Sequence, residues 1–99
     1  MKSDMEGFKE LTDFYFKMKD DHRIGPVHIS LYMAIFHLYQ LNGFVNPVPV
    51  NRALLMELSK IRGLATYHKC VKELVEGRYI HYSPSHDSTI KSTARLLIG

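Results

Sequence analysis

The sequence predicts an α+β fold that is mainly α-helical, with helices through most of the chain and a pair of strands at the end. Apolar residues recur at helical spacing up to about residue 76, as in amphipathic helices. From residue 78 onward, aromatic and β-branched residues alternate with polar ones, as in a strand. Gly and Pro residues separate these segments, which indicates short connections between ordered elements.

The 99 residues are enough for one modest hydrophobic core and too few for two. An apolar content of 45% and a charged content of 23% are ordinary for a soluble globular domain. The single cysteine, Cys70, excludes an intramolecular disulfide, which fits a reducing compartment such as the cytosol. The first residues contain no secretion signal, and the longest apolar stretch, HISLYMAIFHLYQL, is too short to span a bilayer.

The first predicted helix covers residues 8–18, within an N-terminal extension and polar turn formed by residues 1–25. Its apolar positions at helical spacing are Phe8, Leu11, Tyr15 and Met18. Phe14 and Phe16 widen this apolar face, and an extended conformation of the FYF segment stays an alternative.

A long helix is predicted over residues 27–42, directly after the turn-then-helix signal Gly25-Pro26. Apolar residues cover most of its circumference, so we expect burial on more than one side. They form two neighbouring rows: Leu31, Ile35 and Leu38 in one, Tyr32, Phe36 and Tyr39 in the other. The weakly polar stripe that remains consists of Ser30, Ala34 and His37. Gly43 is expected to end the helix in the left-handed conformation.

The segment FVNPVPV has two prolines in three residues and cannot be helical, so it should be an extended connector or a short edge strand. Asn51 is then expected to cap a helix over residues 51–58. The residues of this helix expected to point inward are Leu54, Leu55 and Leu58. Gly63 interrupts the chain, and the next helix is predicted over residues 64–76.

The segment RYIHYSP, residues 78–84, is predicted to be a strand from its alternation and its aromatic content. A turn-rich loop, SPSHDSTI, follows it. The segment IKSTARLLI, residues 90–98, is predicted to be the second strand of a two-stranded hairpin.

Five short motifs follow one another along the chain: HISLY, NGFVNP, LSKI, ATYHKC and YSPS. Together they resemble a group of small bacterial winged helix-turn-helix proteins that are usually described as predicted transcriptional regulators. The resemblance covers roughly residues 24–98, and ATYHKC with YIHYSPS is its most distinctive part. It implies that residues 26–99 form a winged helix-turn-helix domain with a two-stranded wing. One departure is Arg78, where the family pattern has Gly, and a shifted corner between helix and strand is expected there.

In a helix-turn-helix the second helix lies in the major groove of DNA, which for this chain is the helix at residues 64–76. Helical spacing turns Val71 and Leu74 toward the core and leaves a polar and basic face outward. This face consists of Ala65, Thr66, His68, Lys69 and Lys72. Thr66 can bond a phosphate or a base edge, and Lys69 can reach guanine O6 and N7. The alternative is an ordinary solvated charged face.

Phosphate contacts are expected from four residues at or near helix ends: Asn51, Arg52, Arg62 and Lys72. Residues 85–93, at the tip of the wing, hold only His86 and Lys91 as basic residues, so Lys91 should add a weak contact. Residues 22–99 carry nine Lys and Arg against four Asp and Glu. This basic bias is compatible with a polyanionic partner, here double-stranded DNA.

A single domain of this size usually binds DNA weakly, so a homodimer is a second expectation, through residues 8–18 and 27–42. The aromatic residues of that interface would be Phe8, Tyr15, Tyr32, Phe36 and Tyr39. The alternative is that the two helices simply pack on each other as part of the core.

No enzyme activity is predicted, because Ser83, Ser85, His86 and Asp87 share one loop that cannot hold a rigid catalytic triad. His68 and Cys70 are two residues apart and point about 200° apart on a helix, so they cannot share a metal ion. We therefore expect no cofactor, no metal and no small-molecule ligand.

Two other functions stay open: a winged helix that binds other proteins, and an accessory protein of replication or of a mobile element without promoter regulation. The expected location is the bacterial cytoplasm, in association with the nucleoid and not with a membrane.

Overall fold

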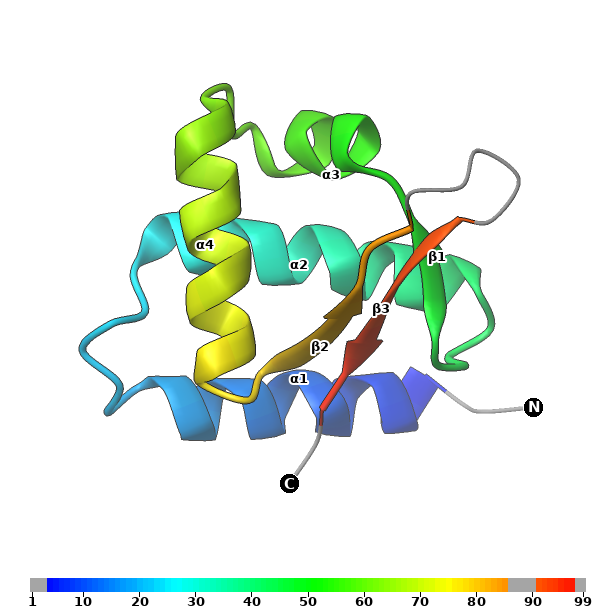
Figure 1. The fold of residues 1–99 in the computed structure, drawn as a ribbon. Helices are drawn as coiled ribbons and strands as arrows, with labels where there is room; N and C mark the ends of the chain where they lie inside the picture. Colours follow the sequence, from blue (N-terminus) through cyan, green and yellow to red (C-terminus); the bar gives the residue numbers. More distant parts are fainter. Residues whose placement is uncertain (1–3, 86–90, 98–99) are drawn as a thin grey trace.

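The structure of the chain is a computed structural model that describes residues 4–85 and 91–97, with the backbone alone at residues 4–6. Within these residues, four helices and three strands follow one another in the predicted order. They are α1 (Asp4–Met18), α2 (Pro26–Leu41), β1 (Val48–Val50), α3 (Arg52–Ser59), α4 (Leu64–Glu76), β2 (Ile80–Ser83) and β3 (Ser92–Leu96) (Figure 1). The predicted α+β class, mainly helical, is confirmed.

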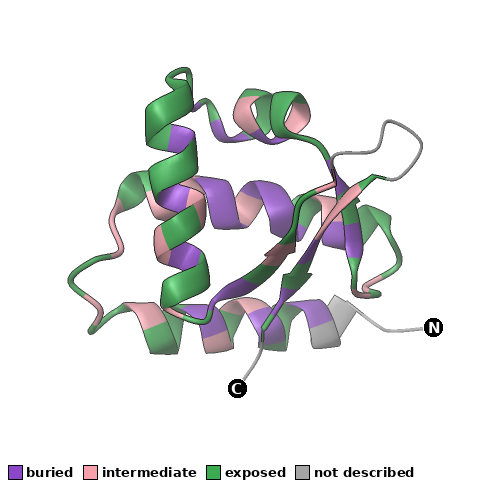
Figure 2. Ribbon diagram, in the orientation of Figure 1, coloured by how far each residue is buried: buried purple, intermediate pink, exposed green. Residues whose placement is uncertain are grey.

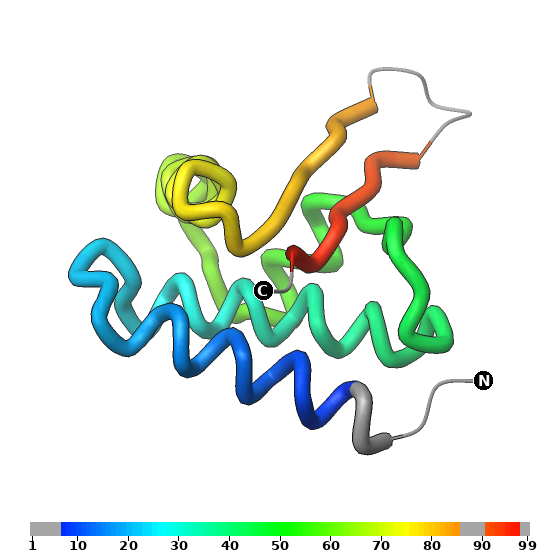
Figure 3. Tube along the Cα trace, turned by 90° about the horizontal axis from the view of Figure 1, so that it is seen from below, coloured from blue at the N-terminus to red at the C-terminus, as the bar shows by residue number. Residues whose placement is uncertain are grey.

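Helix α2 lies in the middle of the molecule. In the view from below, α1 runs along one side of α2, while α4 and the β2–β3 hairpin lie on its other side (Figure 3). Most residues of α2 are buried or half-buried, whereas α1 and α4 each expose a long face (Figure 2). Burial of α2 on more than one side is therefore confirmed, and it explains why apolar residues surround most of this helix.

Local signals set the ends of α2. Pro26 occupies the first helical position, where a backbone N–H would have no acceptor within the helix. Gly43 follows the helix with a left-handed φ of 71°. Ala34, which was expected on a weakly polar stripe, is buried instead. The reason is that α3 packs on this side of α2, where the Ser30 hydroxyl donates to the Ser59 carbonyl at 2.6 Å.

Helix α3 begins at the predicted cap. The Oδ1 atom of Asn51 accepts a hydrogen bond from the Leu54 N–H at 2.7 Å, which satisfies one donor of the first turn. Leu55 is fully buried, but Leu58, expected to point inward, is exposed. The buried direction of this helix runs through Leu55 and Ser59, four residues apart, so Leu58 falls on its flank.

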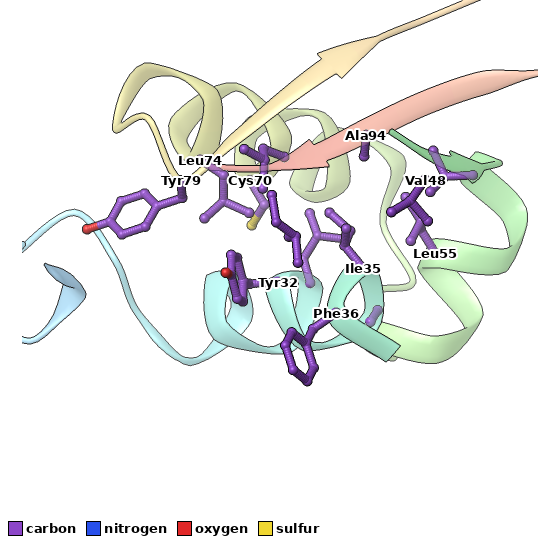
Figure 4. Packing of buried hydrophobic residues seen from close by; sticks show 14 of the residues in the cluster. Tyr32, Ile35, Phe36, Val48, Leu55, Cys70, Leu74, Tyr79 and Ala94 are labelled. Atoms are coloured by element: carbon purple, nitrogen blue, oxygen red, sulfur yellow. The ribbon is translucent and has the colours of Figure 1, made fainter. Parts of the chain in front are cut away.

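The core joins α2 to α4 and to the sheet. Figure 4 shows Cys70 and Leu74 of α4 and Ala94 of β3 on the side of α2 toward which Ile35 points. Phe36 points to the opposite side of α2 (Figure 4). All five side chains are buried, so α2 supplies core residues in two directions.

The sheet has the order β1-β3-β2, with both pairs antiparallel, and Ala94 of β3 is opposite both Val48 and Tyr82. It therefore has three strands: the predicted hairpin of β2 and β3, and β1 at the edge of the sheet, so the alternative of a short edge strand for FVNPVPV is confirmed. Val48 and Val50 are buried, while Pro49 between them is exposed. This alternation is typical of a strand with one face on the core, and the segment pairs with the edge of β3 that faces away from β2. Because Pro49 lacks an N–H donor, an edge strand is the place where it is tolerated.

Helix α1 packs on α2 through aromatic rings. Phe14 stacks on Tyr32 with 3.7 Å between ring centroids, and the Tyr39 hydroxyl donates to the buried Glu10 carboxylate at 2.7 Å. The FYF segment is thus helical. Tyr32, Phe36 and Tyr39, which were expected at a dimer interface, are buried within the chain and are not available to a second subunit. The packing of these residues against α1 agrees with the alternative that the two helices form part of the core.

The corner between α4 and β2 is tied to the N-terminal part of the chain. Arg78 takes a left-handed φ of 62°, so the corner stays at the position where the family pattern has Gly and is not shifted. The Lys17 ammonium donates to the Arg78 carbonyl at 2.6 Å and lies 4.5 Å from the centre of the Tyr79 ring. The Tyr79 hydroxyl donates to Asp21 at 2.9 Å.

Candidate nucleic-acid interface

The turn between α3 and α4 fixes where α4 begins. Lys60 ends α3 in the left-handed conformation, Ile61 is buried, and Gly63 is the N-cap of α4 without a side-chain hydrogen bond. Because Ile61 anchors the turn in the core, the first turn of α4 lies at the edge of the molecule beside α3 (Figure 1). Its backbone N–H groups are therefore accessible to an external acceptor.

Helix α4 is amphipathic. Tyr67, Cys70 and Leu74 form its buried side, whereas Leu64 in its first turn is 47% exposed. The residues predicted to face DNA are all exposed: Ala65, Thr66, His68, Lys69 and Lys72. Burial raises the pKa of the Cys70 thiol, so this group is a packing residue and not a reactive thiolate.

Five predicted contact residues line one open groove of about 840 Å³ between the start of α3, α4 and the β2–β3 hairpin. They are Asn51, Arg52, His68, Lys72 and Lys91. These residues come from three separate segments of the chain, and all five are exposed. The fold therefore brings together three lysine and arginine side chains that the sequence spreads over forty positions.

Apolar and aromatic side chains form the rest of the groove, among them Leu54, Val71 and Tyr82. Tyr67 also lines it, but its hydroxyl is buried and has no hydrogen-bond partner within the described part of the chain. Burial raises the pKa of this hydroxyl, so Tyr67 is neutral at physiological pH. The groove thus combines an apolar floor with a basic rim.

Arg62 and Thr66 lie apart from this groove. They line a smaller hollow of about 340 Å³ near the start of α2, together with Lys60. Residues two apart on a helix point about 200° apart, so the Thr66 side of α4 and its groove side are opposite flanks. Ala65 and Lys69 lie between these flanks and line neither hollow. The predicted face is therefore a convex ridge with a hollow on each side.

Glu73, in the middle of α4, lies one helical turn after Lys69 and is hydrogen-bonded to a residue of α2. The Glu73 carboxylate lies 3.0 Å from His28 Nε2, while His28 Nδ1 accepts a hydrogen bond from the Gly25 N–H at 3.0 Å. Since Nδ1 is the acceptor, the proton is on Nε2 and is donated to Glu73. The hydrogen bond from His28 lowers the pKa of the Glu73 carboxyl. His28 therefore links the N-terminus of α2 to the middle of α4.

The basic residues of the ridge have few internal partners. Lys72 lies 3.9 Å from Glu76, one helical turn away and largely exposed, and such a pair contributes little stability. Within the described residues, neither Lys69 nor Arg52 has a carboxylate at ion-pair distance. From residue 51 to residue 72 the sequence holds five Lys and Arg against one Glu. This surface therefore carries positive charge that the fold does not neutralise.

Two residues of this surface were missed by sequence reasoning. Lys60 lines the smaller hollow and lies in the same basic run as Arg62, so a signal for it was present. Tyr82 lines the groove, but its place depends on the pairing of β2 with β3 and has no local signal.

In the part of the chain that the structure describes, no group of three or more His, Cys, Asp and Glu side chains is placed to hold a metal ion. Among the described helices, none is both long enough and apolar enough to cross a membrane.

Comparisons with protein-family models, with curated proteins and with solved structures found no significant match to this chain. The resemblance to winged-helix regulators therefore stays a prediction that rests on the motifs of the sequence.

Proposed function

We propose that the chain is a winged-helix protein that binds double-stranded DNA and regulates transcription. In this proposal α3 and α4 form the helix-turn-helix, α4 is the recognition helix, and the β2–β3 hairpin is the wing. The observation that carries it is the exposed ridge of α4, whose Lys69 has no ion-pair partner in the described residues and which is flanked by a groove lined by Arg52 and Lys91.

The two parts of the surface would have different roles. A ridge one helix wide fits the major groove of B-DNA, where Thr66 and Lys69 would meet base edges. Arg52 and Lys91, on the rim of the groove beside α4, would contact backbone phosphates. Because the Oδ1 atom of Asn51 already caps α3, this residue would contact phosphate through its amide N–H₂ group alone.

The first experiment is a titration of fluorescently labelled duplex DNA with the protein, followed by anisotropy at several salt concentrations. Each phosphate contact releases counterions, so the apparent affinity should fall steeply as salt rises. Loss of one such contact in Lys72→Ala should weaken binding and reduce the slope of log K against log salt by about 1. Lys69→Ala should also weaken binding, and by different amounts on different sequences if Lys69 reads a base.

The matched control is Lys9→Ala, which removes an exposed lysine from α1 on the opposite side of α2. It has the same change in net charge and should leave the affinity and the salt slope nearly unchanged. Absent binding at low salt would overturn the proposal, and so would equal effects of all three substitutions. The groove would then be assigned to a protein partner.

Regulation is tested separately from binding. The protein is expressed in a bacterial cell, cross-linked to DNA and recovered, and the bound fragments are sequenced. A promoter regulator would be enriched at promoters and located on the nucleoid. Enrichment at a replication origin or at the ends of a mobile element would instead support the accessory role.

A further inference from the structure

The outer face of α1 exposes three large aromatic side chains. Phe8 is 74% exposed, Phe16 is 68% exposed and Tyr15 is 42% exposed. A shallow hollow of about 440 Å³ lies along this face. Its lining residues, which we call the α1 stripe, are Phe8, Leu11, Thr12, Tyr15, Phe16 and Lys19. All six belong to one helix or to the residue that follows it.

Of the apolar residues of the stripe, Leu11 packs against the core, whereas the three aromatic rings are largely exposed. The inner face of α1 already contacts α2 through the stacked rings of Phe14 and Tyr32 and through the buried hydrogen bond between Tyr39 and Glu10. Single exposed apolar residues are normal, but several that adjoin one another on one helix are typical of a binding surface. The stripe is therefore a second apolar face of α1 that no other described segment covers.

The charge of the stripe indicates what can cover it. Its one charged residue is Lys19, and the Lys19 ammonium lies 3.0 Å from the Asp20 carboxylate. The surface is thus close to neutral, which disfavours nucleic acid and strongly acidic or basic peptides as occupants. An identical copy is suitable, because two neutral stripes meet without repulsion between like charges. A two-fold axis perpendicular to α1 would place the two helices antiparallel, an arrangement in which their dipoles attract each other.

The area of the stripe also fits a second copy. A fully buried aromatic side chain removes about 150–250 Å² from water, so at their present exposures the three rings would contribute on the order of 350 Å² per copy. With the other stripe residues the total is about 1,000 Å² for the pair, at the lower limit for a specific interface. A dimer of this size should be weak, with a dissociation constant in the micromolar range.

We propose that two copies of this chain associate through the α1 stripe as an antiparallel, two-fold symmetric helix pair. This interface uses the outer face of α1 and not the buried aromatic residues of α2. Because α1 and α4 lie on opposite sides of α2, the pair leaves the ridge of α4 accessible (Figure 3). The inference stands independently of what α4 binds.

The test is sedimentation equilibrium of the purified chain from low micromolar to near-millimolar concentration. The mean mass should rise with concentration from 11.5 kDa toward twice that value. Phe8→Glu with Phe16→Glu should keep the mass at that of one chain throughout, because four carboxylates would then be buried at the interface. Both side chains are largely exposed, so the fold should persist, and this is checked by circular dichroism.

The control variant is Leu41→Glu, which places one such carboxylate on an equally exposed apolar residue of α2, outside the stripe. It should associate as the unmodified chain does. A cysteine at the centre of the stripe, Thr12→Cys, should form an intermolecular disulfide under mild oxidation, whereas His37→Cys on α2 should not. A chain that stays monomeric at every concentration would overturn the proposal, as would a dimer that the Phe8 and Phe16 substitutions leave intact.

Discussion

Helices α2 and α4 are similar in length, yet their residues serve different purposes. On α2, Leu31, Ile35 and Tyr39 are completely or almost completely buried, and packing partners lie on both sides of the helix. On α4, only the side of Tyr67 and Leu74 is buried, and the opposite side is an exposed ridge on which Lys69 has no carboxylate at ion-pair distance within the described residues. The residues of α2 are thus accounted for by packing within the chain, whereas the exposed half of α4 has no such explanation among the described residues.

The largest effect is expected from Ile35→Ala in α2. It removes most of a fully buried side chain and leaves a cavity that the packed elements around α2 can fill only in part. The free energy of unfolding should therefore fall by about 3 kcal/mol. Urea denaturation followed by circular dichroism measures this loss. The control is Ala65→Ser on the exposed ridge of α4, which should change stability by less than about 0.5 kcal/mol. Equal losses in the two variants would contradict the distinction between the helices.

His28→Ala should have the next largest effect, because it removes the side chain that joins the two helices. Both the hydrogen bond from the Gly25 N–H and the hydrogen bond to Glu73 are lost. Capping interactions of this kind contribute about 0.5–2 kcal/mol, and we expect a loss of about 1–2 kcal/mol in unfolding free energy. His37→Ala, at an exposed position of α2, is the matched control and should be nearly neutral.

Tyr67→Phe removes one oxygen atom, the hydroxyl of Tyr67, from the buried side of α4. The hydroxyl of Tyr67 is buried without a hydrogen-bond partner in the described residues, so its removal should leave the ring packed and relieve a desolvation cost. Stability should stay the same or increase by up to about 1 kcal/mol in a thermal or urea titration. A clear loss of stability would show that the hydroxyl is hydrogen-bonded in solution, with Tyr82 as the nearest candidate in the groove.

Asp21→Asn tests the contact between the segment before α2 and the corner after α4. Hydrogen bonds from Arg23 and from Tyr79 hold the pKa of the Asp21 carboxyl well below its usual range. A depressed pKa in the folded state stabilises the fold above the unfolded value of about 3.9, and this contribution is lost as pH falls through the folded value. The difference in unfolding free energy between the two proteins should therefore shrink as pH falls below about 4. A difference that is independent of pH would assign the contact to packing alone.

Most of the fold could be predicted, because its boundaries are local. Pro26, Gly43, Asn51 and Gly63 each act within one turn of helix, and the observed ends of the helices lie close to these residues. Whether Val48–Val50 is a connector or an edge strand stayed open, because its pairing with β3 depends on residues more than forty positions away. The burial of Tyr32 and Tyr39 of α2 likewise depends on how α1 packs, which the sequence does not show.

The candidate site also has one part that local sequence predicts and one part that depends on distant residues. Exposure of the α4 residues followed from helical spacing, since burial of Tyr67 and Leu74 leaves Lys69 outward. Helical spacing did not predict that Thr66 lies apart from the groove, because this depends on which segment lies on each flank of α4. Periodicity states which side of a helix is buried, but the shape of the exposed surface depends on tertiary neighbours.

The central position of β3 in the sheet has a consequence for synthesis of the chain. β1 and β2 do not pair with each other, and both pair with β3, which follows them in the sequence. While a ribosome is still adding residues 84–91, helices can form and collapse, but both strands keep unpaired edges. Such edges are the places where growing chains associate wrongly with one another. Emergence of residues 92–96 from the ribosome is therefore the step that closes the sheet and ends this exposure.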